Sequence, residues 1–242
     1  MGGRSAAGAL LAFLGVWSAG PAAASAPAPD TGPGVPPPPP AAEAPPPAGW
    51  IALTFDDGPV EGTYQILDIL DAHEVKATFF VMGWRVAAHP EIARDIVARG
   101  HSLQSHGYGH GRWTHLSNVG LQRDLERADQ AIYDAAGVRP TCARPPWGLS
   151  SNRVREVVAA HGMQVMRWDI DTSDYAHQRP ARLLAEAAEW EADSVVLGHD
   201  TVHWAWTPVL GEIIDLLRER GFEFALPCGY RRGSPLPRLS PL

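Results

Sequence analysis

The organising stretch of this chain is Ile51-Ala52-Leu53-Thr54-Phe55-Asp56-Asp57-Gly58-Pro59. Its first five residues are almost all apolar, which predicts a buried strand, and Gly58-Pro59 predicts the turn that ends it. Side chains alternate along an extended strand, so Asp56 and Asp57 point to opposite faces unless the backbone bends between them. Taken alone, the pair is more typical of a solvated turn. With a bend, one carboxylate can bind a metal while the other faces a reacting centre.

Short apolar runs alternate with amphipathic segments through the rest of the domain. Strands are predicted at 51–55, 77–81, 101–105, 141–144, 163–168, 194–198 and 222–226. Helices are predicted at 64–72, 91–99, 118–136, 153–161, 180–190 and 208–220, with Ser117 or Asn118 as a cap and Gly137 as a stop. This alternation predicts parallel strands with right-handed crossovers, in an open doubly wound sheet or a barrel. Both architectures place functional side chains at the carboxyl ends of the strands.

The first 48 residues differ in composition from the rest. They hold 12 of the 23 prolines and only three charged residues. Residues 1–26 predict a secretory signal peptide, with an uncleaved anchor as the alternative, although the apolar run is too short for a comfortable transmembrane span. Residues 27–48 predict a stiff Pro/Ala-rich linker, 49–230 one globular domain and 231–242 a C-terminal tail. We expect a bacterial protein, secreted or in the cell envelope, with no transmembrane domain after cleavage.

The charge balance narrows the class of partner. The chain of 242 residues has a formal net charge of −7 and a single lysine, Lys76. Binding phosphates requires clustered Lys and Arg, so we expect no nucleic-acid or anionic-membrane partner. Eight tryptophans after residue 49 are compatible with sugar binding or with ordinary packing. Cys142 and Cys228 are the only cysteines, and whether they pair stays open, because their Cα separation decides it.

Two histidines follow the third predicted strand, in His106-Gly107-Tyr108-Gly109-His110. The glycines favour a loop, which can still bring both imidazoles to one ion. Together with an aspartate from another strand end they would give three protein ligands and open positions, as in catalytic rather than structural metal sites. His101 is expected to pack at the start of its strand instead.

Polar groups also follow the next three strands. The runs are Arg144-Pro145-Pro146-Trp147-Gly148, then Trp168-Asp169-Ile170-Asp171-Thr172-Ser173-Asp174-Tyr175, then Leu197-Gly198-His199-Asp200. Any one of them is unremarkable, since a lone histidine at a strand end is more often structural than catalytic. Five such groups at five strand ends predict one functional site.

These motifs resemble, in order, those of the polysaccharide deacetylases with a NodB homology domain, the family 4 carbohydrate esterases. The resemblance runs from Ile51 to about Leu226, and Thr54-Phe55-Asp56-Asp57-Gly58-Pro59 is its most specific part. It implies an α/β fold, a distorted (β/α) barrel with about seven parallel strands. It also implies a polysaccharide substrate. We expect the protein to be a monomer.

The resemblance implies a role for each matching residue. Asp57, His106 and His110 would bind a divalent metal, most often Zn²⁺, with Co²⁺, Ni²⁺ or Mn²⁺ as alternatives. Asp56 would be the general base, held by Arg144, and His199 the general acid, oriented by Asp174. Leu197, Trp147 and Tyr175 would contact the substrate.

Three positions depart from the family pattern. Gly107 stands where Ser or Thr is usual, which predicts a less well supported loop, and Tyr175 replaces a tryptophan. Trp204 and Trp206 are unusual after the acid histidine and are candidates for sugar stacking or for rim packing. We expect an exported metal-dependent deacetylase of amino-sugar polymers such as peptidoglycan or chitin-like glycans. The alternatives are an O-acetyl esterase acting on xylan and a non-catalytic carbohydrate-binding module.

Overall fold

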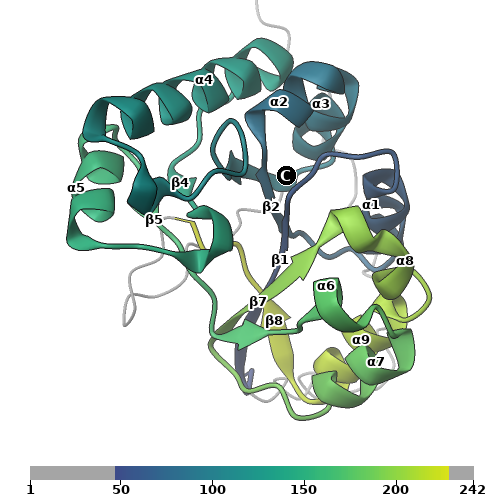
Figure 1. Ribbon diagram of the computed structural model, residues 1–242. Coiled ribbons are helices and arrows are strands. Elements are labelled where there is room, and N and C mark those ends of the chain that lie inside the picture. The colour runs from purple at the N-terminus through teal and green to yellow at the C-terminus, as the bar shows by residue number, and fades with distance from the viewer. Residues whose placement is uncertain (1–46, 229–242) are drawn as a thin grey trace, which may run out of the picture. The chain divides into compact units, whose positions relative to one another are not determined.

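Figure 1 shows the computed structural model, which describes residues 47–228. The predicted signal peptide, nearly all of the predicted linker and the predicted C-terminal tail lie outside these residues. Within the described part, no helix combines the length and apolar character needed to cross a membrane.

The strands form one curled sheet in which every pairing is parallel (Figure 1). The order is β5-β4-β3-β2-β1-β7-β6, and β8 pairs with the beginning of β1. The two edge strands, β5 and β6, are not paired with each other in the described residues, so the barrel is incomplete. The bounds are β1 Gly49–Asp56, β2 Thr78–Val81, β3 Ser102–Ser105, β4 Cys142–Ala143, β5 Gln164–Val165, β6 Ile170–Asp171, β7 Ser194–His199 and β8 Phe222–Phe224.

All seven predicted strands are present, and the distorted (β/α) barrel is confirmed. The structure adds β6, a two-residue strand in the acidic segment that follows β5. Such a short strand has no periodicity of its own. It exists because Ile170 and Asp171 pair with Val196 and Leu197 of β7.

The helices lie around the outside of the sheet (Figure 1). All six predicted helices are present, and α2, α6 and α8 are additional pieces too short to show an amphipathic pattern. Ser117 caps α4, because its Oγ accepts the Gly120 N–H at 3.1 Å. The bounds are α1 Thr63–Ala72, α2 Gly83–Ala88, α3 Pro90–Ala98, α4 Asn118–Ala136, α5 Asn152–Ala160, α6 Asp174–His177, α7 Pro180–Ala187, α8 His203–Trp206 and α9 Leu210–Glu219.

The main core surrounds β1, whose side chains are almost fully buried on both faces. The Phe55 ring lies 5.4 Å from Phe79 and meets the edge of Trp206 at 5.1 Å, measured between ring centroids. Burying a side chain of this size contributes ~1.5–3 kcal/mol to stability. Trp206 is 1% exposed, so of the two alternatives left open for it, sugar stacking is excluded. The reason is that α8 turns its ring inward, over Gly198 of β7.

Cys142 of β4 and Cys228, just after β8, form a disulfide with their Cα atoms 5.8 Å apart. The sequence left this pairing open. The bond closes a loop with a sequence separation of 86 and ties the segment that follows the last strand to the sheet.

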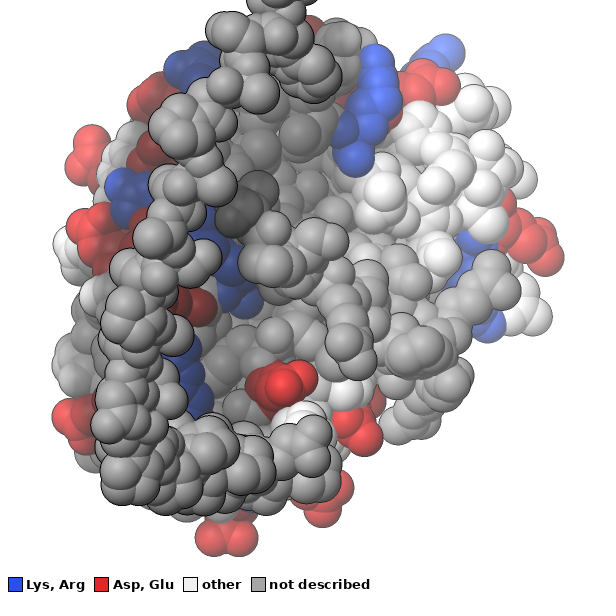
Figure 2. Space-filling view, turned by 180° about the vertical axis from the view of Figure 1, so that it is seen from behind, with Lys and Arg blue, Asp and Glu red and all other residues white. Residues whose placement is uncertain are grey.

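Charges of both signs share the surface. On the face shown in Figure 2, acidic and basic side chains of the described residues alternate along the left and right edges rather than gathering by sign.

Candidate active site

The functional side chains predicted from the sequence meet at one end of the sheet. Asp56 and His199 are the last residues of β1 and β7 and are paired in register. They open onto a pocket of about 310 Å³. Its lining residues are Asp56, Asp57, His106, His110, Trp147, Gly148, Trp168, Asp171, Tyr175, Leu197 and His199.

A backbone bend separates the two adjacent carboxylates at the end of β1. Asp57 has a φ of 76°, a left-handed conformation that is uncommon for a residue with a side chain. Its N–H donates to the Phe80 carbonyl oxygen at 3.2 Å, which anchors the bend to β2. As a result Asp56 turns toward the buried interior and Asp57 toward the histidine loop, as the two-role interpretation of this pair requires.

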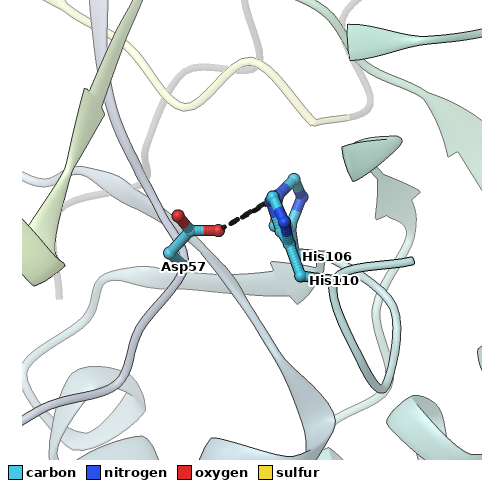
Figure 3. A group of neighbouring side chains, drawn as sticks. All are labelled: Asp57, His106 and His110. Carbon is cyan, nitrogen blue, oxygen red and sulfur yellow. Dashed lines mark ion pairs between the residues drawn. The ribbon is translucent and has the colours of Figure 1, made fainter. Parts of the chain in front are cut away.

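Asp57 and the two histidines form a compact set of possible metal ligands. Asp57 Oδ1 lies 3.4 Å from His106 Nε2 and 3.2 Å from His110 Nε2, and the ligand atoms all lie within 4.8 Å of one another. Figure 3 shows both imidazole rings turned toward the carboxylate. Asp57 Oδ1 is buried and accepts no hydrogen bond from the described residues, as expected of an atom placed to bind a cation. Two imidazoles and one carboxylate suit zinc and related ions.

The electrostatics of this cluster also fit a cation. Burial alone would raise the pKa of Asp57, but its interactions with His106 and His110 outweigh burial and hold the pKa well below its usual range. The His106 Nδ1 atom lies 2.8 Å from the Arg144 carbonyl oxygen, which can only accept a hydrogen bond. Donation from Nδ1 to this carbonyl leaves Nε2, the ring nitrogen that faces Asp57, available as a metal ligand.

The histidine loop is supported by Asp124, which the sequence analysis missed. Asp124 Oδ2 accepts the Tyr108 N–H and the Trp113 indole N–H, both at 3.1 Å. Gly107 has a φ of 78°, and a Cβ at this position would lie 2.5 Å from Asp124 Oδ2. The lack of a hydroxyl at Gly107 predicted a less well supported loop. The structure shows that Asp124 provides support and takes the space that a side chain at 107 would need.

Asp56 is held by a buried arginine. Arg144 is fully buried, and its Nη1 donates to Asp56 Oδ1 at 2.7 Å and to Thr54 Oγ1 at 2.8 Å. The guanidinium also lies over the Phe80 ring, 4.0 Å from its centroid. Removing one partner of a buried ion pair typically costs ~3–5 kcal/mol, so the pair strongly restrains the position of Asp56.

Asp174 orients His199 through both of its oxygens. His199 Nδ1 lies 2.7 Å from Asp174 Oδ1, and the His199 backbone N–H donates to Oδ2 at 2.7 Å. The Trp206 indole N–H also donates to Oδ2 at 2.7 Å, a contact that no sequence pattern indicated. Burial would lower the pKa of His199, but Asp174 outweighs it and raises the pKa to about 9. His199 is thus positioned as a proton donor.

The other acids after these strands have different surroundings. Asp171 Oδ1 accepts the Ser173 N–H at 2.8 Å, and Asp169 Oδ2 accepts the Val195 N–H at 3.0 Å. Asp200 is 1% exposed and accepts a hydrogen bond from Thr63 Oγ1 at 2.6 Å. Burial raises the pKa of Asp200 to about 7.

Aromatic side chains form the rim. Trp147 and Tyr175 line the pocket and are 59% and 55% exposed. Trp168 also lines the pocket, although the sequence analysis treated it only as the end of a strand. Trp204 is half exposed, and its indole N–H donates to Gln178 Oε1 at 3.1 Å, next to α6.

Comparison with known proteins places this geometry in a family. The family model described as polysaccharide deacetylase matches residues 43–166. The peptidoglycan-N-acetylglucosamine deacetylase PgdA of Listeria monocytogenes is 33% identical over 72% of this chain and 37% of its own length. The bifunctional xylanase/xylan deacetylase of Cellvibrio japonicus is 27% identical over 72% of this chain and 26% of its own length. This chain thus spans well under half of either relative.

A solved structure supports the same assignment. The family 4 carbohydrate esterase from Streptomyces lividans, in complex with acetate, superposes with a TM-score of 0.71 and 28% identity, covering 74% of this chain and 93% of that one. Both the sequence and the fold therefore agree with the motifs at the strand ends. The chain belongs to the polysaccharide deacetylase family, family 4 of the carbohydrate esterases.

Proposed function

We propose that this protein hydrolyses N-acetyl groups of an amino-sugar polymer in the bacterial cell envelope, releasing acetate and leaving a free amine. The observation that carries the proposal is the convergence of three units in one pocket. These are the Asp57, His106 and His110 cluster, the Asp56–Arg144 pair and the His199–Asp174 pair. A non-catalytic binding module would have no need for the last two.

The reaction requires three kinds of assistance, because an amide is a poor electrophile with a poor leaving group. A divalent metal, most often zinc in such a donor set, would be held by Asp57, His106 and His110. When bound, it would lower the pKa of a water molecule and polarise the acetyl carbonyl group. The protein residues supply the proton transfers and the positioning.

Asp56 takes the proton of the attacking water, since Arg144 occupies one of its oxygens and leaves the other on the pocket side. His199 donates its proton to the nitrogen as the C–N bond breaks, and Asp174 keeps it charged until then. The backbone N–H near Trp147 stabilises the developing oxyanion. Leu197 and Trp147 pack against the acetyl methyl group, and Tyr175 contacts the sugar.

An O-acetyl esterase acting on xylan is the second candidate, because the same groups cleave esters and one relative is a xylan deacetylase. We also propose that the protein is exported and that it is a monomer.

Acetate release tests the proposed function. Protein comprising residues 50–242 is freed of metal with a chelator, reloaded with zinc, cobalt, nickel or manganese, and assayed on N-acetylglucosamine oligomers, peptidoglycan and acetylated xylan. We expect metal-dependent acetate release from the amino-sugar substrates. Equal activity with and without metal would refute the mechanism, and release from xylan alone would favour the esterase.

A further inference from the structure

Arg112 lies beside the pocket, two residues after His110. Its guanidinium carbon is 5.5 Å from the centroid of the Trp147 ring, and Trp147 lines the pocket with more than half of its side chain exposed. The Trp147 indole N–H donates to the His110 carbonyl oxygen at 3.3 Å. Arg112, Trp147 and the loop that carries His110 therefore form one connected edge of the pocket.

The guanidinium of Arg112 has no anionic partner among residues 47–228. It is exposed, and its one described side-chain interaction is the contact with Trp147. Arg99, Arg139 and Arg182, in contrast, each pair with a carboxylate. The loop beside Arg112 also leaves open space, since a Cβ on Gly109 would meet no atom within 4 Å. A ligand can thus approach this edge.

The lining of the pocket also includes an acid from another part of the sheet. Asp171 of β6 is exposed and lines the same pocket, and the Ser173 N–H fixes one of its oxygens at 2.8 Å. A substrate carboxylate would be attracted by Arg112 and repelled by Asp171. Arg112 would therefore favour an anionic glycan, and Asp171 would disfavour any placement that brings the carboxylate of the glycan toward β6.

We propose that Arg112 binds a carboxylate of the substrate, and that the preferred substrate is a glycan with free carboxylates beside its acetylated amino sugars. This inference rests on the proposed function. A guanidinium whose side-chain contact is with an aromatic ring keeps its N–H groups free and suited to bidentate binding of a carboxylate. In peptidoglycan the carboxylate comes from the lactyl group of muramic acid or from the stem peptide. Chitin has no such group.

The test compares two forms of one polymer. Peptidoglycan strands freed of stem peptides carry a carboxylate on each muramic acid, and coupling to methylamine removes that charge without changing the sugars. We expect the wild-type protein to favour the charged strands by about tenfold in kcat/KM, and this preference to weaken with added salt. The ratio of kcat/KM for charged strands to kcat/KM for neutral strands should fall to about one in Arg112→Ala and to an intermediate value in Arg112→Lys.

A matched control removes the same charge elsewhere. Arg182 on α7 is exposed and paired with Glu186, so Arg182→Ala should keep the wild-type ratio. If only strands with intact stem peptides show the dependence on Arg112, the ligand is a peptide carboxylate, which still supports the inference. A wild-type ratio near one on strands both with and without stem peptides, or a ratio that Arg112→Ala leaves unchanged on both, overturns it. Absence of acetate release from every strand would instead contradict the proposed function.

Discussion

Asp174 Oδ1 lies 2.7 Å from His199 Nδ1, while Oδ2 of the same carboxylate accepts both the His199 backbone N–H and the Trp206 indole N–H. All three contacts are made to the carboxylate of Asp174, a residue that is 1% exposed. One buried charge thus sets both the orientation and the protonation state of the proposed general acid.

Asp174→Asn should lower the pKa of His199 from about 9 toward its ordinary value of 6.5, because the attracting charge is lost. His199 acts in its charged form, so activity is lost as pH rises through this pKa. The alkaline limb of the rate profile should therefore move to lower pH, and kcat at neutral pH should fall roughly 10²-fold or more. NMR titration of His199 in the metal-free protein checks the pKa directly. An unchanged titration would remove Asp174 from this role.

Trp206→Phe should raise the pKa of His199, whereas Asp174→Asn lowers it. Losing the indole N–H leaves the charge of Asp174 less dispersed, so the pKa of His199 should rise slightly, while stability falls by about 1.5–3 kcal/mol or more. Trp190→Phe is the matched control, because Trp190 is buried in the main core and, among the described residues, makes no hydrogen bond to Asp174. It should lower stability and leave the His199 titration as it is. A shift of equal size in both variants would contradict the account.

Asp200→Asn should change how stability depends on pH. The pKa of Asp200 is raised from 3.8 to about 7 in the folded state, so the folded protein holds a proton that the unfolded chain has released. Stability from this group is complete below pH 3.8 and is lost as pH rises to about 7, by about 1.4 kcal/mol per pH unit within that window. Urea unfolding at several pH values should show a flatter profile for Asp200→Asn. Parallel profiles for the two proteins would count against this assignment.

Trp204→Ala tests whether the half-exposed indole beside Gln178 stacks on the polymer. We expect KM for long oligomers to rise roughly fivefold, since such aromatic contacts are worth ~0.5–1.5 kcal/mol, while values for the shortest substrates stay the same. Tyr133→Ala is the control, because Tyr133 is 44% exposed on α4 and lies outside the pocket. Equal effects on short and long substrates would exclude an extended subsite at Trp204.

The order of elements and most of the pocket were predictable from the sequence. Apolar runs and helical periods are local signals, and parallel strands bring their carboxyl ends to one edge, so Asp56 and His199 were expected to meet. The sequence left open whether the backbone bends between Asp56 and Asp57, and the structure shows the bend as a positive φ at Asp57.

The remaining features depend on distances that no local pattern encodes. Asp124 supports the histidine loop from α4, and Trp206 reaches Asp174 across a sequence separation of 32. Trp204 and Trp206 lie two residues apart in the same sequence context, yet the Trp206 ring is buried and the Trp204 ring is exposed. Which way a short helix such as α8 turns is decided by packing against β1 and β7.

Zinc content and acetate release, measured on the same samples of wild type, Asp56→Asn and His106→Ala, test the central claim most directly. We expect Asp56→Asn to keep its zinc and lose turnover roughly 10²-fold or more, whereas His106→Ala should lose both zinc and turnover. His89→Ala, a change of a partly exposed histidine outside the pocket, should lose neither. Near-normal turnover in Asp56→Asn, or full zinc content in His106→Ala, would contradict the assignment of base and ligands.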